Sequence, residues 1–185
     1  MGKNVSYHQL FHSFCFNPSL RFDGQDTDEV PILVFRAHPI TQLFWIINGF
    51  FILLFIFGLN IFLPSYLGFY QIIFINLFGL SFIFSYFYFN FLHWFFNVGI
   101  VTNKRVLDVD FYGLIYKETT IAMLNKIEDI TAKVGGFFPS FFDYGNVFIQ
   151  TASNEANIEF MNIPKPQQVT KIINQLLKNG KSNHL

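Results

Sequence analysis

Charged residues are missing from a long stretch in the middle of this chain. Between Thr41 and Asn103 the sequence has no Asp, Glu, Lys or Arg, although about a quarter of the residues in ordinary globular domains are charged. Phenylalanine clusters there instead, because 16 of the 28 phenylalanines of the chain lie between Leu43 and Phe96. A stretch of this length without charge is too apolar for a soluble core, so we expect it to lie in a membrane.

Net charge and cysteine are scarce as well. Twelve basic and twelve acidic side chains leave a formal net charge of zero, so the chain has no overall field to attract nucleic acid. The single cysteine, Cys15, excludes an intrachain disulfide and a cysteine-rich zinc site. Residues 1–12 lack the apolar run and cleavage site of a signal peptide, so we expect the first apolar run to be a permanent anchor.

Catalytic motifs are also missing. The sequence shows no nucleophile with a base, no glycine-rich phosphate loop and no supported pair of acids. We therefore expect no enzyme, and no catalytic, cofactor-binding or metal-binding residues. His8 and His12 have the spacing of a two-histidine metal site, but no third ligand accompanies them. His38 and His93 border the apolar stretch, where histidine is an ordinary interfacial residue.

Two apolar runs make up the uncharged stretch. Residues 43–63 would span about 30 Å as a helix, which is the thickness of a hydrocarbon core. A second run, 69–92, follows a short break at Pro64. Because lipid leaves backbone groups no other partners, the pattern predicts an antiparallel transmembrane hairpin within residues 41–96. Aromatic residues typical of the membrane interface lie near its ends, namely Trp45, Tyr66, Tyr70 and Trp94.

Positive charge flanks the hairpin on one side. Arg36 precedes the first span and Lys104 and Arg105 follow the second, whereas loop 64–68 has no lysine or arginine. The positive-inside rule then predicts that both termini are cytoplasmic and the loop is outside. The polar side chains of the spans are amides, so an ion pathway would lack its usual ionisable carriers. These amides are Asn48, Asn60, Gln71, Asn76 and Asn90.

After residue 97 the hydrophobic pattern changes to period two, which is typical of strands. We expect strands at 98–102, 104–111, 114–120, 126–132, 145–151 and 157–163. Residues 110–113 should form a turn, and residues 153–156 a hairpin loop. The earlier segment 30–35 is either a further strand or a run lying against the domain.

A helix closes the chain. Pro166 suits a first helical turn, and Asn179-Gly180 suits an end. Between them one apolar stripe recurs at helical spacing, formed by Val169, Ile172, Ile173, Leu176 and Leu177. The pattern predicts an α+β membrane protein, in which the hairpin is followed by an antiparallel sheet or open barrel capped by this helix. The expected parts are a polar cytoplasmic segment at 1–40, the hairpin at 41–96, the domain at 97–180 and a tail at 181–185.

Several short motifs, in order, resemble those of the bacterial pleckstrin-homology-like (PH-like) family of small membrane proteins. They are Arg36-Ala37-His38-Pro39, Ile100 to Val106 (IVTNKRV), Ile121 to Ile130 (IAMLNKIEDI), Tyr144-Gly145-Asn146-Val147 and the closing helix after Pro164. The resemblance implies a PH-like fold tethered to a bacterial plasma membrane. It implies no chemistry, because PH-like folds bind lipids, peptides and proteins alike.

Four phenylalanines stand out in a segment broken by glycine and proline. Phe137, Phe138, Phe141 and Phe142 follow Gly135-Gly136, so we expect a loop whose rings cap the core, rest in the bilayer interface or contact a protein. Headgroup recognition by charge is disfavoured, because nine basic residues from Asn97 to Leu185 are matched by eight acidic ones.

These observations together predict a membrane-anchored cytoplasmic PH-like module that binds or scaffolds. We expect it to contact the lipid bilayer and a protein partner or a second copy of itself, and no nucleic acid or small-molecule substrate. The alternative is a subunit of a membrane complex or transporter in which the transmembrane hairpin is the functional part.

Overall fold

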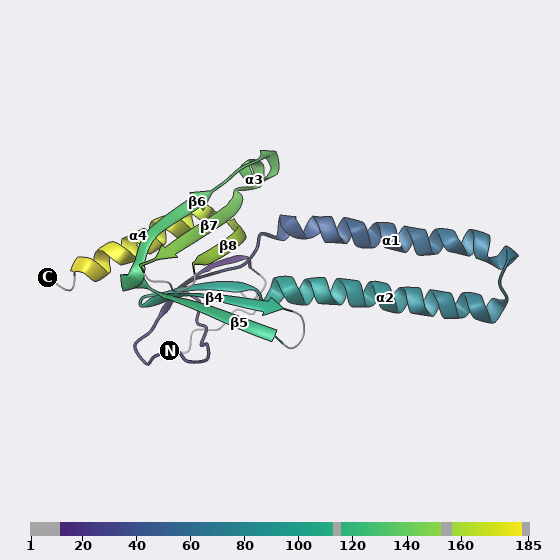
Figure 1. The fold of residues 1–185 in the computed structure, drawn as a ribbon, viewed down its shortest axis with the longest axis horizontal. Coiled ribbons are helices and arrows are strands. Elements are labelled where there is room, and N and C mark those ends of the chain that lie inside the picture. Colours follow the sequence, from purple (N-terminus) through teal and green to yellow (C-terminus); the bar gives the residue numbers. More distant parts are fainter. Residues whose placement is uncertain (1–11, 113–115, 153–156, 183–185) are drawn as a thin grey trace. The chain divides into compact units, whose positions relative to one another are not determined.

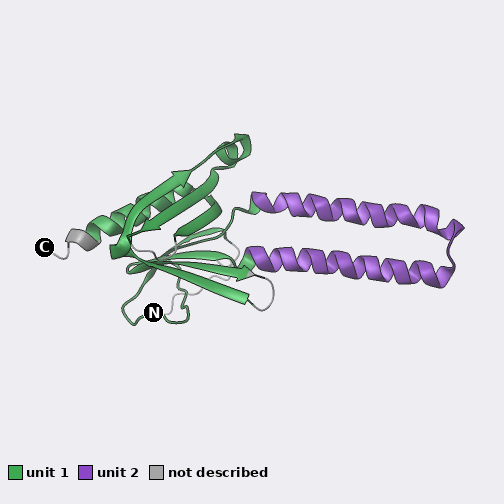
Figure 2. Ribbon diagram, viewed as in Figure 1, with its two compact units in different colours: residues 1–39, 95–185 green, residues 40–94 purple. Residues whose placement is uncertain are grey.

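The computed structural model describes residues 12–112, 116–152 and 157–182. The chain forms two compact units, shown in Figure 2. One unit combines Met1–Pro39 with Phe95–Leu185, and we call it the domain. The other, Ile40–Trp94, we call the hairpin.

Eight strands and four α-helices are present in the described residues (Figure 1). The strands are β1 (Phe14–Phe16), β2 (Pro31–Phe35), β3 (Val98–Thr102), β4 (Arg105–Tyr112), β5 (Tyr116–Met123), β6 (Ile127–Lys133), β7 (Tyr144–Thr151) and β8 (Ile158–Pro164). The helices are α1 (Leu43–Phe62), α2 (Phe69–Phe96), α3 (Phe137–Phe142) and α4 (Pro166–Ser182). Short 3-10 turns lie at Pro39–Gln42, Leu63–Ser65 and Leu124–Lys126.

The hairpin is inserted between two neighbouring strands of one sheet. Sheet A has five antiparallel strands in the order β1-β2-β3-β4-β5, and sheet B has three in the order β6-β7-β8. Strand β2 precedes α1 and β3 follows α2, yet the two strands pair, with Phe35 opposite Gly99. The domain is therefore larger than the 97–180 expected from the sequence, because β1 and β2 complete its sheet. The segment 30–35 is a strand.

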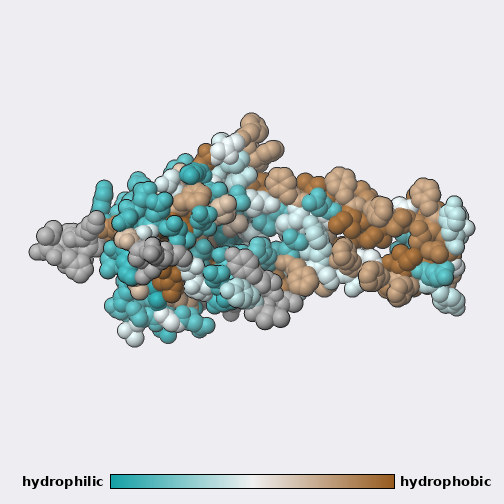
Figure 3. Space-filling model, in the orientation of Figure 1, coloured by the Kyte–Doolittle hydropathy of each residue, from teal (hydrophilic) through white to brown (hydrophobic). Residues whose placement is uncertain are grey.

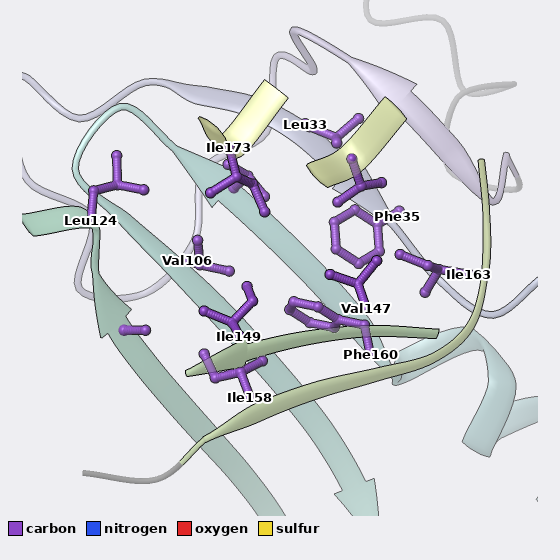
Figure 4. Packing of buried hydrophobic residues seen from close by; sticks show 13 residues of the cluster. Leu33, Phe35, Val106, Leu124, Val147, Ile149, Ile158, Phe160, Ile163 and Ile173 are labelled. Carbon is purple, nitrogen blue, oxygen red and sulfur yellow. The ribbon is translucent and has the colours of Figure 1, made fainter. Parts of the chain in front are cut away.

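The core lies between the two sheets and α4 (Figure 4). Phe35 of sheet A meets Phe160 of sheet B edge to face, with ring centroids 4.7 Å apart. Gly99 is needed beside them, because an added Cβ would collide with both rings. From α4, Val169 and Ile173 are fully buried, and the rest of the predicted stripe packs against the core. The predicted closing helix and its buried face are confirmed.

Three local expectations need correction. Residues 137–142 form a short helix and not a loop. The turn expected at 110–113 is wrong in its first three residues, which continue β4 because they pair in register with β5. Helix α4 does not end at Asn179-Gly180 but runs to Ser182, since one glycine near a helix end costs only about 1 kcal/mol. Loop 153–156 lies outside the described residues.

Within the hairpin, α1 and α2 pack side by side at small residues. Gly49 is buried against the Phe87 ring, and an added Cβ would lie 2.5 Å from its Cζ atom. Trp45 meets the same ring edge to face. Further along, the side chains of Asn60 and Asn76 exchange two hydrogen bonds, of 2.9 and 2.7 Å. These contacts confirm two antiparallel apolar helices, and both are long and apolar enough to cross a membrane.

Candidate functional site

The four phenylalanines singled out in the sequence lie on α3, between β6 and β7. Gly136 enters the helix with φ +106°, a conformation that glycine adopts without strain. Pro139 is tolerated because it lies in the first turn, where backbone N–H groups have no helical partner. The helix ends at Asp143, which is left-handed (φ 52°) and donates its N–H to the Pro139 carbonyl.

Three of the four rings of α3 are exposed, whereas Phe142 is half-buried. Phe137, Phe138 and Phe141 are 78%, 58% and 72% exposed. They contact one another, since Phe137 stacks on Phe141 and also meets Phe138 edge to face. We call Phe137, Phe138 and Phe141 the aromatic patch, and Figure 3 shows apolar side chains at this part of the surface. Capping of the domain core, one of the roles open from the sequence, is therefore not the role of these three rings.

The aromatic patch lies at the end of the domain where the chain departs for α1. Tyr144 lies two residues after the end of α3, and its ring stacks on the His38 imidazole at 5.5 Å. The His38 N–H also donates to the Asn162 carbonyl at 2.7 Å. Burial lowers the pKa of His38, although the nearby Asp143 carboxylate opposes the shift. His38 thus holds the segment that leads to α1 against β7 and β8. Its partner Tyr144 comes directly after Asp143, the residue that caps α3.

The return from α2 reaches the same end of the domain. The Phe111 N–H donates to the Asn97 side chain at 2.8 Å, and the Phe111 ring lies 5.2 Å from that of Phe96. Arg36 is 8% exposed, and its guanidinium lies 4.8 Å from the centre of the Phe95 ring. Together with the pairing of Phe35 and Gly99, these contacts define what we call the attachment end of the domain.

The basic motif after β3 binds an acidic segment of the chain itself. Lys104 forms ion pairs with Asp26 at 3.1 Å and with Asp28 at 2.7 Å. The Asn103 side chain accepts the Val30 N–H at 2.8 Å and donates to the Asp28 carbonyl. The lysine of the IVTNKRV motif therefore holds residues 26–30 against the turn between β3 and β4. Its role there is structural.

Arg105 and Glu29 form a buried ion pair. Arg105 Nε and Nη2 donate to the two carboxylate oxygens of Glu29, each at 2.9 Å, and the Thr102 hydroxyl donates at 2.8 Å. Glu29 is only 3% exposed. Burial by itself raises the pKa of Glu29, but the hydrogen bonds from Arg105 and Thr102 outweigh it and lower the pKa. The sequence alone did not reveal this pair, because Glu29 and Arg105 are far apart along the chain.

An acidic group on β4 and β5 escaped sequence reasoning altogether. Asp108 lies two residues from the buried Val106 and opposite Gly99, so it is on the inner face of sheet A. The pKa of Asp108 is raised to about 7, chiefly by burial and in addition by the nearby carboxylates of Asp110 and Glu118. The period-two pattern of β4 assigns Asp108 to a face, but only the fold shows that the face is the inner one.

The histidine and amide expectations have separate outcomes. His8 lies outside the described residues, and within the described part of the chain no group of three or more potential ligands is placed to hold a metal ion. Asn60 and Asn76 bond each other, and the Asn90 side chain donates to the Tyr86 carbonyl. Gln71 accepts the Gly68 N–H at 2.9 Å. These amides thus have partners inside the hairpin.

The fold is that of a PH-like protein, with two antiparallel sheets whose core is closed by a C-terminal helix. A family model, the bacterial PH domain, matches residues 43–177. The match covers more than half of the 185 residues, so the chain belongs to the bacterial PH domain family. A search of curated proteins found no match, and a search of solved structures found none. The matched range begins at α1, so β1 and β2 precede it.

Proposed function

We propose that this protein is a membrane-anchored binding or scaffolding module, in which α1 and α2 cross a bilayer and hold the PH domain at its cytoplasmic surface. Its ligand is a lipid, a protein partner or a second copy of the chain. The proposal assigns no reaction to the protein, since the sequence has no nucleophile with a base and no phosphate-binding loop.

One observation carries the proposal: the apolar hairpin leaves the domain from β2 and returns to β3, which are paired neighbours in one sheet. Large apolar side chains cover α1 and α2, for example Phe57 and Phe84, which are both 71% exposed. Water disfavours such a surface, whereas lipid accepts it. The 20 residues of α1 correspond to about 30 Å and the 28 of α2 to about 42 Å, which suffices for a bilayer.

The two connections suit a domain that is held at a membrane surface. Each end of the hairpin leads within a few residues into a paired strand, so the domain has two tethers and not one flexible linker. Arg36, Lys104 and Arg105 lie on the domain side, and residues 64–68 have no basic side chain. This asymmetry supports a cytoplasmic domain, with both termini on the cytoplasmic side of a bacterial plasma membrane.

Alkaline extraction of membranes from expressing cells tests the anchor. We expect the chain to stay in the pellet at pH 11, whereas a peripheral protein would be released. Recovery in the soluble fraction would overturn the anchor.

Labelling of single cysteines tests the orientation. In a Cys15→Ser background, Ser65→Cys should react with an impermeant maleimide in intact cells, and Lys178→Cys should react only after lysis. The reverse pattern would overturn the cytoplasmic placement. Crosslinking followed by affinity purification from native membranes would then identify a protein partner or a second copy, and extraction of copurifying lipid would identify a lipid.

A further inference from the structure

The aromatic patch has the composition of a lipid contact. It lacks the charged and hydrogen-bonding side chains that would orient a specific protein partner. No charged residue occurs from Val134 to Phe142. Ser140 is the only hydroxyl on α3, and it donates to the Gly136 carbonyl at 2.8 Å, so its hydrogen is already used. The patch therefore presents apolar ring surface with little to orient a partner. A bilayer requires no such orientation, because insertion of aromatic rings is driven by the removal of apolar area from water.

The position of α3 within the domain points to the same occupant. His38, which leads to α1, stacks on Tyr144, and Tyr144 lies two residues after the end of α3. The β2 end and the β3 start are paired at this end as well. The aromatic patch thus lies at the attachment end of the domain, where the chain passes into its apolar helices.

We propose that the aromatic patch inserts into the interfacial region of the same bilayer that α1 and α2 cross. The inference rests on the proposed function, since it takes the hairpin to span that bilayer. The α3 helix is then a third point of contact, separate in sequence from the two tethers. Three points define a plane, so insertion would set the orientation of the domain and determine which of its faces remain open to the cytoplasm.

A fluorescent label at the aromatic patch tests this insertion on the full chain. In a Cys15→Ser background, Phe141→Cys carries the NBD fluorophore, and the protein is reconstituted into vesicles of phosphatidylcholine and phosphatidylglycerol. The vesicles contain lipid with a nitroxide at carbon 5 of the acyl chain. The matched control is NBD at Gln150→Cys, an exposed position on β7 that pairs with Asp129 away from the attachment end.

We expect NBD at position 141 to be quenched by the nitroxide lipid at least threefold more than NBD at position 150, and to be protected from iodide in the buffer. Equal quenching at both positions overturns the inference. Protection from iodide without quenching by the lipid also overturns it, because the patch would then be covered by protein. In both cases the anchor survives if NBD at Leu54→Cys, within α1, is quenched by the same lipid. No quenching at position 54 overturns the anchor and this inference with it.

A second variant separates loss of insertion from loss of folding. With NBD at Phe137→Cys, the added changes Phe138→Ser and Phe141→Ser should lower quenching by the nitroxide lipid at least twofold. The same changes should leave the urea midpoint of the domain unchanged, since both rings are largely exposed. Unchanged quenching, or a clear drop in the urea midpoint, would contradict the proposed role.

Discussion

Phenylalanine is used differently in the domain core and in the hairpin. In the domain, Phe35 is completely buried and Phe160 is 4% exposed. In the hairpin, Phe57 and Phe84 keep most of their surface outside the protein. The hydrophobic effect stabilises the domain through contacts that the chain supplies itself. The hairpin has few such contacts, and the bilayer that we propose would supply the apolar surroundings that its surface favours.

Polar groups show the same difference. The domain places a charged pair, Glu29 and Arg105, at a buried site where hydrogen bonds compensate both charges. The hairpin contains only uncharged partners of this kind, Asn60 and Asn76. A buried charged pair is tolerated where hydrogen bonds compensate both charges, whereas neutral amides suit an apolar helix pair. The two regions should therefore respond to different substitutions.

The largest expected effect separates the core of the domain from the hairpin. Ile173→Asp would place a carboxylate at a fully buried position on α4, which should cost roughly 4 kcal/mol or more. Pulse proteolysis of the protein in detergent measures the urea transition of the domain, and this transition should no longer be cooperative. The hairpin should keep its fluorescence, because both tryptophans of the chain, Trp45 and Trp94, lie in it.

A neighbouring position supplies the control for that change. Asn174→Asp, on the exposed side of α4, adds the same charge and should leave the urea transition in place. If Ile173→Asp unfolded like the unchanged chain, α4 would not be docked on the sheets.

Removal of the buried carboxylate tests the N-terminal segment. Glu29→Ala leaves Arg105 without its bidentate partner, so the domain should lose about 2 to 4 kcal/mol of stability. Because the pKa of Glu29 is lowered in the fold, its contribution is present above the ordinary value near 4.5 and is lost as the pH falls. Urea titrations at pH 7 and pH 4 measure both effects. Asp28→Ala, whose side chain is 72% exposed, should change stability little, and an equal loss would contradict the role of burial.

Asp108→Asn should stabilise the domain and change its pH dependence. The folded state holds the Asp108 proton up to about pH 7, whereas the unfolded chain releases it near 3.8. The native chain should thus lose stability as the pH rises between these values. At pH 8 we expect a gain on the order of 2 kcal/mol for the partly solvated side chain, and almost none at pH 4. Exposed Glu128→Gln is the control, and a gain at both pH values would rule out titration as the cause.

The smallest expected effect belongs to the hairpin. Asn60→Leu leaves the Asn76 amide without its interhelical partner, at a cost of about 1 kcal/mol. Asn60→Leu with Asn76→Leu should cost less than the sum of the single changes. Tryptophan fluorescence during an SDS titration should follow this loss, while the urea transition of the domain stays unchanged. A shift of the domain transition would show that the two regions do not unfold independently.

Local pattern explains why some elements were predictable. The hairpin depends on uninterrupted apolar runs and a short connection, and α4 on five apolar residues at helical spacing, all of which lie close together in the chain. The phenylalanines of 137–142 were noticed for the same reason. Their helical conformation was missed, because Gly136 and Pro139 commonly break helices but here lie before and within its first turn.

The sequence by itself determined the α+β class, the two apolar helices, most strands and the closing helix, since each follows from periodicity and composition over short windows. Only the tertiary structure decided that β2 pairs with β3 across the inserted hairpin. The same holds for the partner of Arg105, the inner position of Asp108 and the exposure of the aromatic patch. These features depend on contacts between residues far apart in the chain, and a local pattern contains no information about which distant segment will lie opposite.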